Sequence, residues 1–497
     1  MTLTEELAEW AHALRFEDIP RDVVEIAGLQ LLSQCAAMRT GAAHPLGRRL
    51  VAGFGQPTQP DPRRAAFVLA GLGSWLHFDD TAFAGHLSNS TVAVPMAYAR
   101  SQKLDGRALL TSVIVANECA ARITASATLG PFRGQSATFA HVVGAVAGRL
   151  AGEDVPVRRW VDALGLGLGL PPRTVPIGFL GGDAKVFSAS TPVAVGLDAC
   201  DAAAAGFTGS AEILEHPEGF LSRFSTVPLP EAVTLGLGRR WHTRTMSFKV
   251  HPGGPGMDAA IDCGLELHRA VGPVRAADVA GITVDISLYT AIVNAQAGAY
   301  VRGPQSPVSA LVFALPYLLA TVLLTGDLTI EDFSAAGTGR PERWRLAELV
   351  RVRLDDEMTY DLFHSEVPFG EALRLAGPRA AEWLRPFGAR WKGDGQWLVD
   401  LVGEVEPPSE DFRSARKVTG ARVTVGFRDG RSVSREVDVP VGAVGATGGR
   451  PVADLVREKF LGTGGSAATA DAMTALEPAS AAEVAALLED ALDRTAG

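Results

Sequence analysis

The chain is 497 residues long, and 47% of its residues are hydrophobic whereas only 21% are charged. That balance excludes a disordered or fibrous protein and describes a large globular one. The net charge is −10, from 46 Lys and Arg against 56 Asp and Glu, and no run of five or six like charges occurs. Nothing therefore favours nucleic acid or an anionic membrane as a partner, and we expect an enzyme that acts on a small molecule.

The cysteines and the N-terminal residues indicate the cellular compartment in which we expect the protein. The four cysteines are far apart and form no CxxC pair, which argues against a disulfide framework, a zinc ribbon or an iron–sulfur cluster. Because the first residues carry neither a basic stretch nor an apolar core, we expect no secretory signal. The most apolar window, from Val308 to Leu324, is shorter than the roughly 20 residues that a membrane span needs. We predict a cytoplasmic protein with no membrane partner, and a buried helix at this window with Pro316 near its middle or start.

The chain from its start to about residue 246 has a helical pattern. Thr4 is predicted to cap a first helix, and Pro20 is predicted to open a second. Gly144 and Gly148, four residues apart, would let two helices approach closely. Further helices are predicted at 109–123, 144–150, 193–204 and 259–268.

From about residue 280 the apolar period changes to two, which predicts strands. The last two of these strands flank a turn at Asp429-Gly430. A helix is predicted between the strands at 307–326, so this region is α+β. After Pro451 the helical pattern resumes, and Ser480 with Glu483 forms a capping box for a last helix over 481–492. The predicted strands cover 282–286, 350–354, 423–427 and 433–439.

These patterns together predict a mainly α fold with two domains. Residues 1–246 and 450–497 are expected to form one large all-helical domain that is discontinuous in sequence. Residues 247–449 are expected to form a smaller α+β domain inserted into it.

Common catalytic signatures are missing from the sequence, which has no P-loop, no HExxH zinc motif, no GxSxG element and no EF-hand loop. The densest polar cluster in an apolar setting is His-Phe-Asp-Asp-Thr at 77–81, followed by His-Leu-Ser-Asn-Ser at 86–90. A histidine titrates near neutral pH, as a proton-transfer group should. We therefore look for the chemistry in this cluster.

The cluster at 77–81, preceded by Ala-Ala-Phe-Val at 65–68, resembles the Asp-Phe-Asp-Asp-Thr element of the MmgE/PrpD superfamily, which includes 2-methylcitrate dehydratase and cis-aconitate decarboxylase. Other stretches agree with that family in order and spacing, and the resemblance runs from about residue 4 to about residue 461. These stretches are 118–123 (ECAARI), 182–185 (GDAK) with 206–209 (GFTG), 247–252 (SFKVHP), and 313–317 (FALPY) with Gly326.

The resemblance implies a helical domain from both chain ends, a smaller α+β lid and a homodimer. It also implies a cofactor-independent lyase whose active site lies in the cleft between the two domains. We expect a dehydratase for a hydroxylated di- or tricarboxylate, or for a diacid-bearing metabolite of a specialised pathway. Such a reaction removes the proton α to a carboxylate, so it needs a base, cations for the developing charge and an acid. The expected partner is a small anionic substrate.

Four catalytic positions carry over from the family, namely Thr81, His86, Lys185 and Lys249. The resemblance implies that the two lysines hold carboxylates and stabilise the enolate, while His86 or a deprotonated lysine removes the α-proton. Thr81 would hydrogen-bond a substrate oxygen or cap a helix. His86 comes one residue early relative to the family's spacing.

Three positions depart from the family's pattern. His77 stands where the family has an aspartate, Gln135 where it has a histidine, and Gly254 where it has a second histidine. We expect His77 to act as a further catalytic histidine, because the family's usual set of bases and acids is incomplete here. The candidate substrate-binding residues are Asp79, Gln135, His141 and His251.

Other interpretations stay open. An isomerase or epimerase needs the same proton abstraction without a leaving group, a decarboxylase releases carbon dioxide, and the three substitutions are also compatible with a non-catalytic carboxylate-binding homologue. The histidines and Asp79 offer nitrogen and oxygen ligands, but no pair has the i, i+4 spacing of ligands on one helix, so we expect no metal. Lid candidates for specificity are Tyr289, Arg302 and Ser306.

Overall fold

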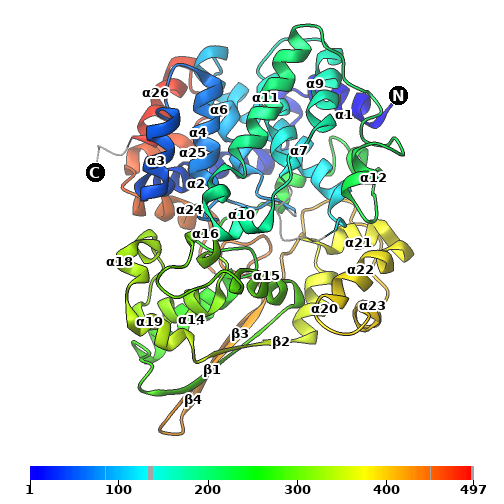
Figure 1. Cartoon of the computed structure of the whole chain (residues 1–497). Coiled ribbons are helices and arrows are strands. Elements are labelled where there is room, and N and C mark those ends of the chain that lie inside the picture. Colours follow the sequence, from blue (N-terminus) through cyan, green and yellow to red (C-terminus); the bar gives the residue numbers. More distant parts are fainter. Residues whose placement is uncertain (84, 132–137, 448, 494–497) are drawn as a thin grey trace.

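The structure, a computed structural model, describes residues 1–83, 85–131, 138–447 and 449–493. Helices dominate it, and one four-stranded sheet lies at the end of the molecule away from both termini (Figure 1). The mainly α class predicted from the sequence is therefore confirmed. The α-helices of the first part are α1 (Leu3–Ala13), α2 (Arg21–Ala43), α3 (Pro45–Phe54), α4 (Pro62–Ser74), α5 (Ser88–Thr91), α6 (Ala93–Gln102), α7 (Gly106–Ala127), α8 (Phe139–Leu150), α9 (Val157–Gly169), α10 (Pro176–Gly181), α11 (Ser190–Ala204), α12 (Phe220–Phe224) and α13 (Glu231–Thr234).

Three C-terminal helices complete the helical domain. They are α24 (Val452–Gly462), α25 (Ala467–Thr474) and α26 (Ala481–Leu492). All three pack against α2, and α26 also packs against α6, so the two ends of the chain share one hydrophobic core. Figure 1 shows this as red helices among the blue ones. The predicted discontinuity of the helical domain is thus confirmed.

Local signals account for the helix ends. The last helix begins at the predicted capping box, where the Ser480 hydroxyl accepts a hydrogen bond from the Glu483 backbone. The first helix is capped by Thr2, not by Thr4 as predicted, because Thr2 forms its own capping box with Glu5. Thr4 is buried inside the first turn instead.

Glycines on α8 allow close packing. A Cβ at Gly144 would lie 2.3 Å from the Ser90 hydroxyl oxygen on α5, and one at Gly148 would lie 3.0 Å from Pro95 on α6. The close helix approach predicted from this pair is confirmed. It also seats α5, which follows the histidine-rich loop, directly on α8.

The middle of the chain forms the α+β part. Its helices are α14 (Asp258–Val271), α15 (Leu288–Gly298), α16 (Val308–Leu311), α17 (Leu315–Thr325), α18 (Ala335–Thr338), α19 (Pro341–Ala347), α20 (Asp356–His364), α21 (Gly370–Ala376), α22 (Ala380–Ala389) and α23 (Gln396–Val402). Its strands are β1 (Val279–Ile286), β2 (Val350–Leu354), β3 (Ala421–Phe427) and β4 (Ser432–Val437). All four predicted strands are present.

The sheet has the order β2-β1-β3-β4, with β1 parallel to β2 and the other neighbours antiparallel. In β1 the side chains of Ile282, Val284 and Ile286 are fully buried, as their alternation predicts. Helix α14 packs against β3 and β4, and α17 packs against α14, so one face of the sheet is covered by helices.

The predicted helix at 307–326 is interrupted. It divides into α16 and α17, and the chain turns between Val312 and Ala314 before Pro316 occupies the first turn of α17. Proline has no N–H to donate and fits the start of a helix better than its middle. This break brings the ring of Phe313 to the cavity described below.

A second, smaller core ties the two parts together. It surrounds Trp383 and Phe363 of α20 to α22 and includes Phe83 and Leu129 from the helical domain. Residues from both parts of the chain are therefore fixed next to one another at the boundary.

Among the described helices, only α7 has the length and apolar composition that a membrane span needs. Of its most apolar window, 89% is buried within the fold. The helix therefore belongs to the buried core of the fold.

Candidate active site

A cavity of about 560 Å³ lies where the helical domain meets the α+β part. Its described walls come from the loop at 77–86, from α7 and α10, from α15, and from the segments at 313, 368–369 and 417–419. The predicted cleft between the two domains therefore corresponds to a real hollow.

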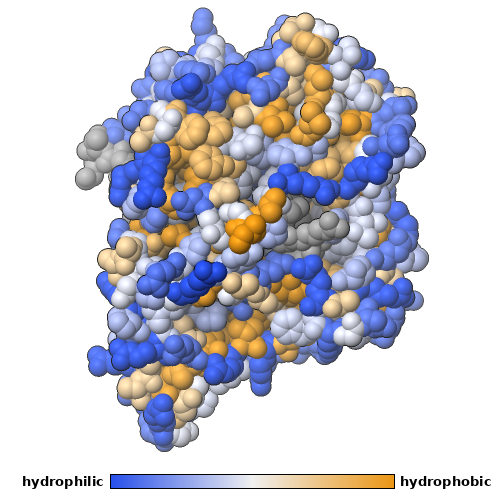
Figure 2. All heavy atoms as spheres, viewed as in Figure 1, coloured by the Kyte–Doolittle hydropathy of each residue, from blue (hydrophilic) through white to orange (hydrophobic). Residues whose placement is uncertain are grey.

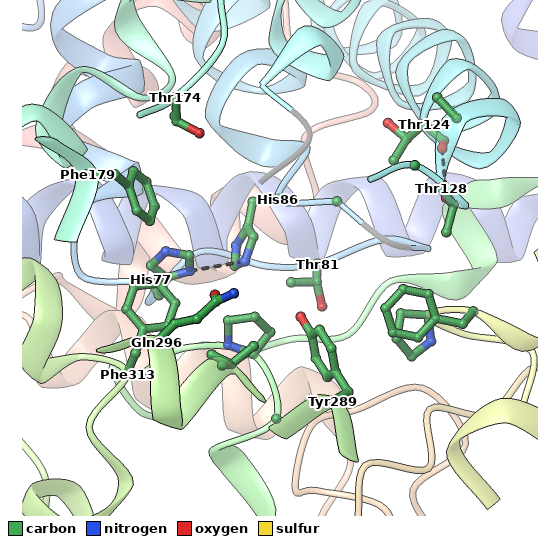
Figure 3. A pocket seen from close by; sticks show the side chains of 18 of the residues that line it. His77, Thr81, His86, Thr124, Thr128, Thr174, Phe179, Tyr289, Gln296 and Phe313 are labelled. Atoms are coloured by element: carbon green, nitrogen blue, oxygen red, sulfur yellow. Dashed lines mark hydrogen bonds between the residues drawn. The ribbon is translucent and has the colours of Figure 1, made fainter. Parts of the chain in front are cut away.

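Two histidines meet at the wall of this cavity (Figure 3). The Nδ1 atom of His77 lies 3.0 Å from Nε2 of His86, and the rings meet edge to face. On its other side, Nδ1 of His86 lies 2.9 Å from Oδ2 of Asp79. A hydrogen-bonded chain thus runs from a buried carboxylate through two imidazoles. Since an ionised carboxylate only accepts, His86 donates from Nδ1 to Asp79 and accepts from Nδ1–H of His77.

The backbone holds His77 in an unusual conformation. Its φ is +49°, in the left-handed region that non-glycine residues seldom adopt and that costs roughly 1–2 kcal/mol. The residue lies three positions after Ser74, the last residue of α4, and its N–H donates to the carbonyl of Ser74. This turn directs the ring to His86, so the strained backbone conformation of His77 is part of the geometry of the site.

Asp79 is held from behind by an amide network. The Asn89 side chain donates to Oδ2 of Asp79 at 2.7 Å, and Gln34 donates to Asn89 at 2.9 Å. All three side chains are buried, so this network fixes the carboxylate and, through it, the orientation of His86. The sequence marks Asp79 as substrate-binding, but its place in the fold is beneath the histidines, outside the described cavity lining.

Burial and nearby charge set the protonation of this chain. Burial lowers the pKa of His77 well below its usual value, and a positive charge on Lys185 or on the His86 ring lowers it further. Burial opposes ionisation of Asp79, yet His86 and Lys185 lower the net pKa of this carboxyl. The stable state near neutral pH is an ionised Asp79 and a neutral His77, ready to accept a proton.

Lys185 lies behind the histidines rather than in the cavity wall. It is 1% exposed, and its ammonium donates to the carbonyl of Ser74 at 3.0 Å. The rings of Phe179 and Phe313 lie 5.5 and 5.8 Å from the ammonium. Burial lowers the pKa of Lys185 to about 7, although Asp79 opposes this shift. The role predicted for Lys185, holding a substrate carboxylate, stays a prediction.

Lys249 is paired within the protein. Its ammonium lies 2.5 Å from Oδ1 of Asp258, and both residues are buried. It does not belong to the described lining of the cavity. Its predicted contact with substrate therefore also stays a prediction.

Thr81 lies in the cavity wall, as expected of a substrate contact. Its backbone pairs with that of Ser247, with N–H···O distances of 3.0 and 2.7 Å in the two directions. Its hydroxyl accepts a hydrogen bond from Lys417 at 3.2 Å. Burial lowers the pKa of Lys417 to about 8, the nearby Lys249 lowers it further and Asp258 opposes both effects. Lys417 is thus a buried ammonium that lines the cavity.

Below this wall, Asp80 belongs to a separate buried cluster. Ser33 donates to Oδ1 of Asp80 at 2.7 Å, and the Lys459 ammonium of α24 lies 3.6 Å from the same oxygen. Burial raises the pKa of Asp80 to about 6, although Lys459 opposes this shift. The cluster joins α24 to the loop at 77–86 and does not line the cavity.

The other predicted histidines lie elsewhere. His141 is buried on α8 with Nδ1 3.1 Å from the Ser90 hydroxyl oxygen, and burial lowers its pKa to about 4. His251 lines a different hollow, where Nε2 lies 3.6 Å from Oδ1 of Asp262. Gln135 lies outside the described residues. Neither described histidine belongs to the cavity lining, so their predicted substrate contacts stay predictions.

Of the three lid candidates, Tyr289 lines the cavity and its hydroxyl points toward Thr81 (Figure 3). Arg302 and Ser306 bond to one another, with the Arg302 N–H donating to the Ser306 hydroxyl at 2.7 Å, and neither is part of the described lining. At position 254 the family's histidine has no room, because a Cβ there would lie 2.1 Å from the Phe313 ring.

Three side chains of the site, His77, Asp79 and His86, place one ligand atom each within 4.8 Å of one another. These atoms already bond to each other, and the Lys185 charge acts on both His77 and Asp79. A nearby ammonium opposes a bound cation. The expected absence of a metal remains a prediction.

Sequence reasoning missed Lys417, Gln296 and Arg173, all of which line the cavity. None lies in a motif, and a lysine near the end of an irregular segment has no signal that separates it from a surface lysine. The aromatic walls were missed as well, because isolated phenylalanines in sequence predict only a core.

The helical domain closed from both ends, the inserted α+β part and the site in the loop at 77–86 define the class of this protein. Residues 5–232 match the MmgE/PrpD N-terminal domain and residues 251–379 match the MmgE/PrpD C-terminal domain. The chain belongs to the MmgE/PrpD family, which includes lyases such as 2-methylcitrate dehydratase and cis-aconitate decarboxylase.

Two curated relatives are cis-aconitate decarboxylases, one from Aspergillus terreus and one from its strain NIH 2624 / FGSC A1156. Each is 26% identical to this chain, over 416 and 403 residues respectively. In both cases the match covers 72% of this chain and 80% of the relative.

Proposed function

We propose that the protein is a lyase that removes the proton α to a carboxylate and then expels water from a hydroxylated carboxylic acid. The observation that carries this proposal is the chain Asp79–His86–His77 at the wall of an aromatic cavity. A carboxylate behind two imidazoles forms a base whose positive charge, once it takes a proton, is stabilised from within the protein.

The first step is transfer of the α-proton to the histidine pair. The pair acts as one unit, because a proton taken up by either ring is shared across the bond between Nδ1 of His77 and Nε2 of His86. Asp79 stabilises the imidazolium, and burial together with the charge of Lys185 keeps His77 neutral until substrate arrives. The electron pair left on carbon delocalises into the substrate carboxylate as an enolate.

The second step is loss of the hydroxyl group. Lys417 supplies positive charge for the enolate oxygen, with Thr81 orienting its ammonium. Burial raises the pKa of Tyr289, so its hydroxyl keeps its proton and can give it to the departing hydroxide. The C–O bond breaks, water leaves and the electron pair forms the alkene. The histidine pair then releases its proton to solvent, and Tyr289 regains one.

Decarboxylation is the second candidate, because both curated relatives are named cis-aconitate decarboxylases. The apolar walls support it, since removing water from around a carboxylate favours loss of neutral carbon dioxide. The same histidine pair would then have to carry a proton taken from solvent, give it to the resulting carbanion and regain it from solvent.

Incubation with a panel of hydroxylated and unsaturated acids in deuterated water separates the possibilities. Loss of water with a new alkene absorbance supports the dehydratase, and loss of carbon dioxide supports the decarboxylase. Deuterium in the recovered acid without alkene indicates an isomerase or epimerase. Binding of an acid without any of these changes would contradict the proposal and indicate a non-catalytic homologue. The His86→Asn variant is the matched control, and it should be inactive in every assay.

A further inference from the structure

The composition of the cavity wall differs from what a compact polyanion needs. Among the described residues, six phenylalanines line the cavity. They are Phe83, Phe139, Phe179, Phe224, Phe313 and Phe369. Aromatic rings each offer a large apolar contact area and no hydrogen bond to a carboxylate. Most of the wall therefore favours the binding of an apolar group.

Positive charge in the described wall is sparse. Lys417 is the one buried cation there, at 6% exposure, and the described lining contains no aspartate or glutamate. Arg173, the other lining cation among the described residues, is exposed and its guanidinium lies 4.1 Å from the centre of the Phe224 ring. A buried charge needs a partner to offset its loss of water. The described wall can thus neutralise one carboxylate in its interior, not three.

The aromatic wall continues on both sides of the histidine pair. The Phe313 ring meets His77 edge to face at 4.7 Å, and Phe179 lies beyond it (Figure 3). Opposite, Tyr289 packs edge to face against Phe369 at 5.2 Å. At Gly254, where the family carries a second histidine, the Phe313 ring occupies the space a side chain would take. An apolar surface here takes the place of a polar contact.

The size and surroundings of the cavity agree with a larger ligand. Its volume of about 560 Å³ falls within the roughly 300–1,000 Å³ of pockets that hold drug-sized molecules. Helix α10, whose residues line one side, carries exposed apolar side chains at its start, with Val175 and Ile177 each 64% exposed. Orange atoms stand out at the place of α10 near the centre of the face in Figure 2.

We propose that the cavity takes a carboxylic acid with a large apolar body, an aromatic or branched aliphatic group. Its carboxylate pairs with Lys417 beside Thr81, and its body lies against the phenylalanine rings. This places the α-carbon near the histidine pair, so the inference refines the substrate class of the function proposed above and rests on the same site.

Isothermal titration calorimetry with four probes tests this without turnover. The probes are phenylbutanoate, butanoate, phenylbutanamide and citrate. We expect phenylbutanoate to bind at least about tenfold more tightly than butanoate, because burying a ring contributes about 1.5–3 kcal/mol and 1.4 kcal/mol is tenfold in Kd. Phenylbutanoate should also bind more tightly than citrate. Citrate binding more tightly than phenylbutanoate, or equal affinity for phenylbutanoate and butanoate, would overturn the inference.

Two variants test the two halves of the contact. Lys417→Met should weaken the binding of phenylbutanoate about tenfold or more and leave the binding of phenylbutanamide unchanged. Lys417→Arg should restore the affinity for phenylbutanoate. Retained amide binding shows that the variant is folded. Ala127→Leu, on α7 in the cavity wall, should weaken both ring-bearing probes, whereas Ala204→Leu, at an exposed position of α11, should weaken neither. Unchanged phenylbutanoate binding in Lys417→Met or in Ala127→Leu would overturn the proposal.

The binding experiments and the turnover assays can contradict the two proposals separately. If phenylbutanoate binds through Lys417 but no acid is converted, the inference stands and the lyase function fails. If compact tricarboxylates are bound and dehydrated, the function stands and the inference fails.

Discussion

His77 and His86 share a hydrogen bond of 3.0 Å between Nδ1 and Nε2, and Asp79 completes the chain at 2.9 Å. His77 stands where the family carries an aspartate. The chain has therefore exchanged a negative charge for a second imidazole directly against the histidine that the family resemblance singles out. Position 77 therefore carries a neutral imidazole in the resting site, where the family would have a negatively charged carboxylate.

Replacing Asp79 by asparagine should lower kcat by about 10²–10⁴-fold with little change in KM, because a neutral amide cannot stabilise the imidazolium formed during proton transfer. Steady-state kinetics on the acid found active in the panel measure this. The control is Asp198→Asn, whose side chain is 65% exposed and lies outside the described cavity lining. A similar loss in the control, or an unchanged kcat in Asp79→Asn, would contradict the proposed role.

Restoring the family's residue with His77→Asp should move the acid limb of the kcat profile to higher pH. A carboxylate next to the remaining imidazole favours its protonated form, so the neutral base appears only at higher pH. The measurement is kcat between about pH 5 and about pH 9. In both variants His86 is the remaining base, so the limb of His77→Gln, which adds no charge, should lie at lower pH than that of His77→Asp. Equal limbs in the two variants would argue against this electrostatic coupling.

The affinity for phenylbutanoate should fall as pH rises above about 8. The pKa of Lys417 is lowered to about 8, so its charged form is present below that pH and is lost above it. Well above the pKa the loss approaches tenfold in Kd per pH unit. Calorimetry across this range gives the curve. Lys417→Arg should show no such fall, because a guanidinium stays charged to about pH 12, and a fall shared by both proteins would assign the titration to another group.

Lys459→Met should destabilise the fold by about 3–5 kcal/mol, because it leaves the buried Asp80 carboxylate without its counter-charge. The pKa of Asp80 is already raised to about 6, so the folded state holds its proton more tightly than the unfolded chain does. Stability that depends on this proton is present at low pH and is lost as pH rises, and the defect should be larger at about pH 8 than at about pH 5. Urea unfolding measures both values. The double variant Asp80→Asn with Lys459→Met should recover part of the loss, and no recovery would contradict the pairing.

Gly144→Ala should lower the free energy of unfolding by about 1–3 kcal/mol, because the new Cβ would lie 2.3 Å from the Ser90 hydroxyl oxygen. Gly28→Ala on α2 is the matched control. No atom lies within 4 Å of the Cβ it adds, so it should be neutral or stabilise by up to about 1 kcal/mol. Denaturant unfolding of both variants checks the difference, and equal effects would mean that close helix packing is not the cause.

Local patterns predicted much of the fold. The alternation at 282–286 and 350–354 became β1 and β2, and the capping box at Ser480 became the start of α26. These features depend on neighbours within a few residues. The helix at 307–326 was wrong as one unit, because the chain turns before Pro316, which occupies the first turn of α17 rather than the middle of a longer helix.

The sequence by itself determined the family, the helical and strand periods, and the loop that carries His77, Asp79, Thr81 and His86. Those residues lie within ten positions, so their proximity follows from the chain. Only the tertiary structure decided which cation reaches the cavity. Lys417 meets Thr81 across 336 positions, while Lys185 and Lys249 are held by groups within the protein. Contacts between distant segments depend on packing, and packing of the two domains sets the charge and shape of the cavity between them.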